Sequence, residues 1–344
     1  MTIQTPGSST SSADYSAIVK VTPFTQILST EALFDKSHKL SKLSPIDEFI
    51  ENANKLNLLW INQDEISSEF ASILFLGYFS AVESYVRALV RTLIQTDIYS
   101  QKCAENQQIT FGAALHHNKQ LLPEALMDNH SFTASENILK TFKSLTDIEL
   151  VIDEAITTEL DKICQLRHCC VHRFGKLGAK NAMALGLTSH SKLFEKPLTL
   201  SRDDLLLVSS TLRSVVKTIN NAAYKAVLDR TFPTVPVGKG DKKRLPKSLW
   251  SKDYEADKEL FIKYYKVFSS TNKDESPKMK EMYTRFIAEK EQALQKISKG
   301  AAKKPNIPQG QGDANGHPQG DTSHQQENNA VDVPQEQVAQ EGAK

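Results

Sequence analysis

The chain has 344 residues, of which 40% are apolar and 24% are charged, and its 42 Lys and Arg against 41 Asp and Glu give a net charge of +1. This length is enough for one large domain or two modest ones, and the balanced charge excludes a histone-like protein that binds nucleic acid by bulk charge. Four cysteines exclude a disulfide scaffold. There is no sign of a signal peptide, and no uninterrupted apolar run reaches the roughly 18 residues of a membrane span. We therefore expect a soluble, cytoplasmic protein that does not associate with membranes.

Helix signals are common along the chain and strand signals are scarce, so we predict an all-α fold. Ser44 and Pro45, followed by two acidic residues, are typical of a helix start, because a Ser cap, an early proline and acids in the first turn all favour it. Ser201 introduces a similar pattern. The predicted helices cover about 45–57, 64–97, 147–172 and 202–230, with one or two short helices in a variable stretch near 100–145 and a Gly- and Lys-rich loop up to Thr199.

Composition divides the chain into four parts. A polar arm that we expect to be disordered covers 1–28, and a helical domain covers 29–232. Residues 233–299 form a linker and a basic extension, in which 239–299 hold sixteen Lys or Arg against ten Asp or Glu, with helices predicted near 253–269 and 277–298. Residues 300–344 contain no aromatic residue and cannot bury enough apolar area to offset their ordering entropy, so we predict a disordered tail.

The segment 147–172 carries the most chemistry. Arg167 lies at the edge of an apolar stripe about 120° wide, which we expect to pack into the core, and His168 and His172 lie roughly opposite its centre. The stripe consists of residues spaced by three or four: Ile152, Ile156, Leu160, Ile163, Leu166, Cys170 and Phe174.

Three interpretations fit the Arg and the two His. They can simply complement the carbonyls and the dipole of a helix end. Cys164, His168 and His172 have the spacing i, i+4, i+8, and His side chains four residues apart can bind zinc. Alternatively, a histidine that titrates near neutral pH and an arginine that binds phosphate are the groups needed for phosphoryl transfer.

The sequence around these residues resembles the HEPN superfamily, whose ribonucleases carry Arg-x4–6-His. Here the motif is Arg167 to His172, and the segment 77–94 resembles an earlier core helix of such proteins through Glu83, Ser84, Tyr85 and Arg87. The resemblance covers about 45–230, includes a long insertion between the two helices, and is greatest to the RiboL-PSP-HEPN branch and a second branch of bacterial conflict systems. The residue after the Arg is often Asn or Asp in the superfamily and is His168 here.

The resemblance implies a HEPN-like helical bundle and a metal-independent endoribonuclease without a cofactor. Arg167 would stabilise the phosphate and His172 would act as acid or base, while His168, Glu83 and Lys176 would support the site or bind RNA. The plainer interpretation of Glu83 is a surface ion pair with the residue four positions later. The plainer interpretation of Lys176 is an exposed side chain in a solvated loop. The implied role is in a toxin–antitoxin or antiphage system, with a possible antitoxin or defence partner. The alternative is a non-catalytic HEPN module that dimerises or binds a protein or RNA.

One geometric difficulty follows from the spacing. Five helical steps place Arg167 and His172 about 140° apart around an α-helix. Both can face one phosphate only if the helix loosens near Cys169 and Cys170, if the arginine wraps sideways, or if two copies of the chain build the site together. We expect a homodimer in which a cleft between the protomers holds both residues, as the resemblance also implies.

Overall fold

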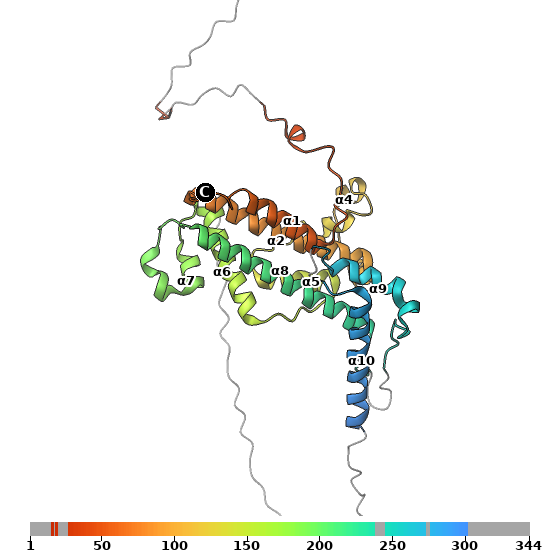
Figure 1. Ribbon diagram of the computed structural model, residues 1–344. Helices are drawn as coiled ribbons and strands as arrows, with labels where there is room; N and C mark the ends of the chain where they lie inside the picture. The colour runs from red at the N-terminus through yellow and green to blue at the C-terminus, as the bar shows by residue number, and fades with distance from the viewer. Residues whose placement is uncertain (1–14, 17, 20–26, 238–244, 273–275, 302–344) are drawn as a thin grey trace, which may run out of the picture. The chain divides into compact units, whose positions relative to one another are not determined.

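The computed structural model describes residues 15–16, 18–19, 27–237, 245–272 and 276–301 (Figure 1). The chain is all-α: these residues form helices and one isolated antiparallel bridge, between Lys176 and Pro197, with no strand among them. The predicted tail from 302 onward lies outside the described residues, and so does most of the predicted arm over 1–28.

The helices begin where the sequence supplies caps. The Ser44 hydroxyl accepts a hydrogen bond from the Asp47 amide (3.3 Å), and Ser201 and Asp204 form a reciprocal capping box. The elements in chain order are η1 (Thr30–Leu33), α1 (Pro45–Leu58), α2 (Ser68–Thr96), α3 (Ile98–Ala104), α4 (Phe111–His116), η2 (Leu122–Met127), α5 (Ser135–Thr146), α6 (Glu154–Arg173), α7 (Ala179–His190), η3 (Ser191–Leu193), α8 (Arg202–Thr231), α9 (Tyr254–Phe268) and α10 (Met279–Ala301).

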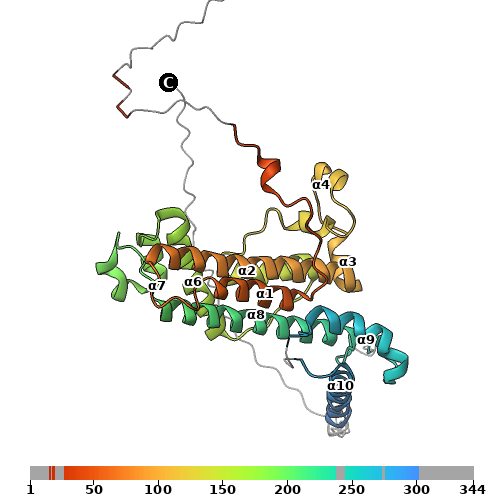
Figure 2. The same cartoon turned by 45° about the horizontal axis from the view of Figure 1, so that its top comes forward.

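Helix α2 is the centre of the bundle, because α1, α3, α5, α6, α8 and α9 all pack against it. In both views α1, α2 and α8 run side by side, with α7 at one end of the bundle and α3, α4 and α9 at the other (Figures 1 and 2). Most of the buried apolar side chains join in one continuous core. By length and composition α2 could cross a bilayer, but 61% of its most apolar stretch is buried inside the protein.

One predicted helix start and one predicted loop are wrong. The helix predicted over 147–172 begins only at Glu154, because α5 ends in a left-handed turn at Asp147 (φ 51°) and Asp153 caps α6. The predicted loop up to Thr199 contains α7 and η3. Helix α7 is interrupted at Gly186, whose φ of 103° is accessible mainly to glycine.

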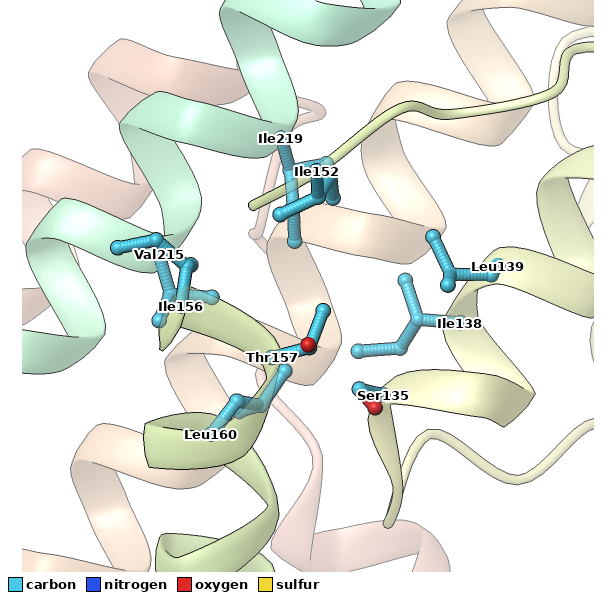
Figure 3. A pocket seen from close by; sticks show the side chains of 9 residues that line it. All are labelled: Ser135, Ile138, Leu139, Ile152, Ile156, Thr157, Leu160, Val215 and Ile219. Carbon is cyan, nitrogen blue, oxygen red and sulfur yellow. The ribbon is translucent and has the colours of Figure 1, made fainter. Parts of the chain in front are cut away.

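The apolar stripe of α6 packs as predicted along most of its length. Leu160 and Ile163 are buried, and Ile152, Ile156, Leu166 and Cys170 pack against the core. Figure 3 shows Ile152, Ile156 and Leu160 facing side chains of α5 and α8 around a cavity of only about 10 Å³. Phe174 is the exception. It follows the last helical residue and is 89% exposed, so its predicted burial is wrong.

The helices after residue 233 share this core. Trp250 packs edge-on against Phe261 and Phe286, and Tyr283 donates a hydrogen bond to the buried Asp257. The loop after α9 is tied to α1, because Asp47 accepts hydrogen bonds from Ser270 and Thr271. The extension predicted over 233–299 therefore continues the packing of the 29–232 domain through α9 and the first turns of α10. Residues 238–244, which hold its densest basic run, lie outside the described residues.

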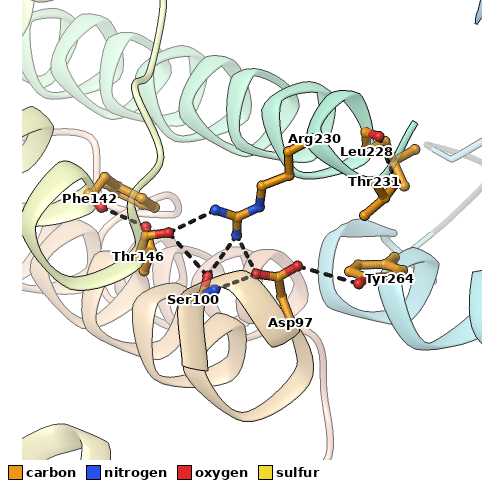
Figure 4. A network of polar contacts seen from close by, with 8 residues as sticks. All are labelled: Asp97, Ser100, Phe142, Thr146, Leu228, Arg230, Thr231 and Tyr264. Carbon is orange, nitrogen blue, oxygen red and sulfur yellow. Dashed lines mark hydrogen bonds and ion pairs between the residues drawn. The ribbon is translucent and has the colours of Figure 1, made fainter. Parts of the chain in front are cut away.

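A buried ion pair joins four parts of the bundle (Figure 4). The Arg230 guanidinium of α8 pairs with Asp97, whose side chain is fully buried between α2 and α3. Arg230 also donates to the Thr146 carbonyl at the end of α5 and to the Ser100 hydroxyl, each at 2.8 Å. From α9, the Tyr264 hydroxyl reaches Asp97 at 3.3 Å. This network fixes α9 to the core at the end of the bundle away from α7.

Candidate functional site

The candidate site lies on the last two turns of α6. Arg167 points from α6 toward α2, where its guanidinium lies over the Phe79 ring, 5.7 Å from the ring centroid. The same guanidinium is 4.0 Å from the Glu83 carboxylate, and the two side chains are only 23% and 28% exposed. A partly desolvated ion pair with a stacked arginine fixes the direction of the guanidinium better than a solvated pair does.

Glu83 pairs across helices rather than along its own helix. Arg87, its neighbour four residues on, instead pairs with Glu124 at 3.5 Å and donates a hydrogen bond to the Met127 carbonyl at 3.0 Å. Burial raises the pKa of Glu83, and the charges of Arg167 and Arg87 oppose that rise. Glu83 is therefore suited to position the guanidinium of Arg167.

His168 and His172 form a second group on the exposed side of α6. Their rings are in contact, with centroids 4.5 Å apart and planes tilted by 49°. Burial lowers the pKa of His168, and the nearby charges of His172, Lys180 and Arg167 lower it further. Neutral imidazole is therefore favoured at position 168, where it can accept a proton.

Within one chain Arg167 and His172 diverge. Helix α6 is regular from Glu154 to Arg173, so the loosening considered near Cys169 and Cys170 does not occur. Arg167 faces α2, while the side of α6 that carries His168 and His172 borders α7. His168 is the link between them, since it touches His172 and lies close enough to Arg167 for that charge to act on its pKa.

The end of α6 is stabilised by its own backbone. Phe174 adopts a left-handed conformation (φ 51°, ψ 45°), and the Gly175 amide donates to the Cys169 carbonyl at 3.0 Å. Lys176 follows with an exposed side chain, and its backbone bridges to Pro197. The predicted supporting residue Lys176 therefore lies where α7 and its flanking turns join α6.

The three cysteines of α6 are not arranged for metal binding or nucleophilic attack. The described residues contain no group of three or more His, Cys, Asp or Glu side chains placed to hold a metal ion. Cys164, His168 and His172 therefore do not form the zinc site that their spacing allows. Burial raises the pKa of Cys164 to about 12 and that of Cys170 to about 11, which disfavours the reactive thiolate.

An apolar surface borders the Arg167 side of the site. Ile73 of α2 is 65% exposed and Phe174 is 89% exposed, and Val171 of α6 is also exposed. A hollow of about 310 Å³ opens between α2, the end of α6 and residues 197–199, with Ile73, Leu76 and Phe174 in its lining. Clustered exposed apolar side chains of this kind are typical of interaction surfaces.

Phe79 and Lys180 are missing from the sequence-based site. In the sequence, the apolar Phe79 is indistinguishable from an ordinary core residue. Only the packing of α2 on α6 brings its ring under Arg167. Lys180 belongs to α7, and its charge acts on the pKa of His168. Comparison with protein families, with curated proteins and with solved structures finds no match to this chain.

Proposed function

We propose that this chain is a metal-independent endoribonuclease of the HEPN type. The observation that carries the proposal is the arrangement on α6: an arginine held by Glu83 and Phe79, a histidine pair in ring contact, and charge coupling between them. Guanidinium and imidazole groups are the ones that RNA transesterification requires. The test is RNA cleavage by the purified chain in EDTA, with His172→Ala as the inactive control.

The chemistry needs no other nucleophile. A base removes the proton of a ribose 2′-OH, the 2′ oxygen forms a bond to the adjacent phosphorus, and the bond from phosphorus to the 5′ oxygen breaks. An acid then protonates the leaving 5′ oxygen, which gives a 2′,3′-cyclic phosphate and a 5′-OH end. Arg167 stabilises the negative charge that develops on the phosphoryl oxygens.

The histidine pair divides the two proton transfers. The charges around His168 favour its neutral form, so we assign it the role of base, and His172 the role of acid. This assignment gives position 168, where the superfamily often has Asn or Asp, a function of its own.

The pH dependence tests the assignment. The rate should fall in acid as His168 becomes protonated, with an apparent pKa below the ordinary 6.5 of histidine. His172 and Arg167 on α6 and Lys180 on α7 are the charged groups that lower the His168 pKa. Lys180→Gln removes one of them, so the His168 pKa should rise and the acid limb should move to higher pH. Lys119→Gln, an exposed lysine in the insertion, should not move it. An acid limb at the same pH in both variants would refute the role of His168.

We further propose that the active unit is a homodimer. Arg167 and His172 diverge in one protomer, and the exposed side chains of Ile73 and Phe174 form one apolar surface with Cys170 of α6 around a hollow. Pairing this surface about a two-fold axis buries it and brings two copies of the site together. Phe174 is suited to fill the hollow of the partner, since the same face carries both the protruding ring and the cavity.

Two measurements test the homodimer. Phe174→Asp should give a monomer in light scattering, because the charge would be buried in the interface. Mixing Arg167→Ala with His172→Ala protein should restore part of the activity, since mixed dimers contain one intact Arg167 and one intact His172. A monomeric wild type with full activity, or mixtures that stay inactive, would contradict the shared site.

The biological setting follows from the resemblance alone. We propose a cytoplasmic role in bacterial toxin–antitoxin or antiphage defence, with an antitoxin or another partner protein that restrains cleavage. A second candidate is a non-catalytic module that dimerises or binds a protein or RNA. The exposed apolar surface beside Phe174 favours it, and so does the engagement of Arg167 by Glu83. A module of that kind would keep its function in the His172→Ala variant.

A further inference from the structure

The segment 176–197, which we name the α7 arm, is a closed excursion from α6. Its two ends are joined by hydrogen bonds from Leu177 to Lys196 and from Glu195 to Leu177, each 3.0 Å long. Inside it, Leu177, Ala182 and Leu185 pack on Cys169 in a small apolar cluster separate from the main core. The Asn181 side chain donates to the Gln165 side chain of α6 at 2.9 Å. The arm is thus a small structural unit anchored to the helix that carries the candidate site.

The α7 arm and the end of α6 together carry an excess of positive charge. Residues 165–200 hold six Lys or Arg against one acidic residue, whereas the rest of the chain holds 36 against 40. The one acid, Glu195, already pairs with Arg173. The side chains of Lys176, Lys180, Lys192 and Lys196 are exposed, and none forms an ion pair with a described residue. An unneutralised group of lysines creates a local positive field although the chain is almost neutral.

This field is continuous with the histidine pair. The charge of Lys180, on the first turn of α7, contributes to the lowered pKa of His168. Anchoring through Asn181 keeps the arm on the side of α6 that carries the histidines. A phosphate bound at the histidine pair is therefore close to the charge of Lys180, the arm lysine nearest to the site along α7.

We propose that the α7 arm binds the phosphates of single-stranded RNA next to the cleaved bond. The proposal rests on the proposed ribonuclease function and adds which segment of the chain supplies substrate affinity. Exposed lysines beside exposed apolar side chains suit a single strand, because its backbone needs positive charge and its bases need apolar or aromatic surfaces. Met183, Leu187 and Phe194 supply such surfaces on the arm.

The experiment compares substrates of two lengths. For wild type, Lys192→Gln, Lys196→Gln and the double variant, kcat/KM is measured on a dinucleotide and on an RNA of about 12 nucleotides. Each contact to a single-stranded phosphate contributes a slope of about 0.7 in log K against log salt. The measured quantity is kcat/KM on the long RNA divided by kcat/KM on the dinucleotide. Each substitution should lower this ratio about fivefold more at 0.1 M salt than at 1 M salt. The matched control Lys119→Gln should leave the ratio unchanged.

The outcomes separate the arm from the proposed cleavage. If wild type cleaves both RNAs and the arm variants keep the wild-type ratio at every salt concentration, the arm proposal is wrong and the ribonuclease stands. If wild type cleaves neither RNA, the ribonuclease fails, and fluorescence anisotropy with the same RNA still tests the arm. There the double variant should bind more weakly than Lys119→Gln. Equal RNA binding, with loss of binding only to vesicles of phosphatidylserine and phosphatidylcholine, would instead assign the arm to an anionic membrane surface.

Discussion

Replacing either Arg167 or His172 by alanine should lower the rate of RNA cleavage in EDTA at least about a hundredfold, since loss of an acid–base group or of a charge-stabilising donor costs about 10²–10⁴ in rate. Neither residue belongs to the main core. His172 is exposed, and Arg167 is partly exposed with its guanidinium over the Phe79 ring. Circular dichroism and the melting temperature should therefore stay close to wild type.

Matched controls exist for both substitutions. His117→Ala removes an exposed histidine at the end of α4, and Arg285→Ala removes an exposed arginine of α10 that pairs with Glu281. Both should cleave RNA at the wild-type rate. Equal rates for all four variants would mean that the arginine and histidines of α6 form only a polar helix end.

Among the proposed substitutions, Arg230→Met should lower the free energy of unfolding the most. The substitution leaves the Asp97 carboxylate buried without its ion-pair partner, and breaking a buried pair costs about 3–5 kcal/mol of unfolding free energy. The loss is measured as the shift in the urea midpoint at constant slope. Adding Asp97→Asn to Arg230→Met should recover part of it, because the uncompensated charge is then gone.

The exposed pair Lys143 and Asp147 provides the comparison for this effect. Lys143→Met should barely move the urea midpoint, since both side chains of that pair are solvated. If Arg230→Met shifted the urea midpoint as little as Lys143→Met does, the network of Figure 4 would not hold α9 on the bundle.

Much of the fold could be predicted because its signals are local. Ser44 and Ser201 mark helix starts because their hydroxyls accept hydrogen bonds from the amides of Asp47 and Asp204, and the stripe of α6 reflects its 3.6-residue period. Local signals mislead where a helix ends. The spacing that predicts burial continues to Phe174, but the left-handed turn at that residue stops the helix, and the ring is exposed.

The α7 arm illustrates a second limit. Its glycines and lysines are typical of a loop, yet Leu177, Ala182 and Leu185 find partners on Cys169, and that tertiary contact stabilises a helix. The site has the same dependence. The motif identifies Arg167 and His172, but the contact of Arg167 with Phe79 and Glu83 arises only from the packing of α6 on α2.

The most direct test of the account is cleavage of a DNA oligonucleotide pool in which a few consecutive positions are randomised ribonucleotides. The purified full chain, in EDTA, should cut only on the 3′ side of a ribose and leave a 2′,3′-cyclic phosphate, because the 2′-OH is the nucleophile and no metal takes part. His172→Ala should leave the pool intact. Cuts between deoxyribonucleotides, cleavage that appears only when a divalent metal is added, or no cleavage of the pool by wild type would contradict the proposed ribonuclease.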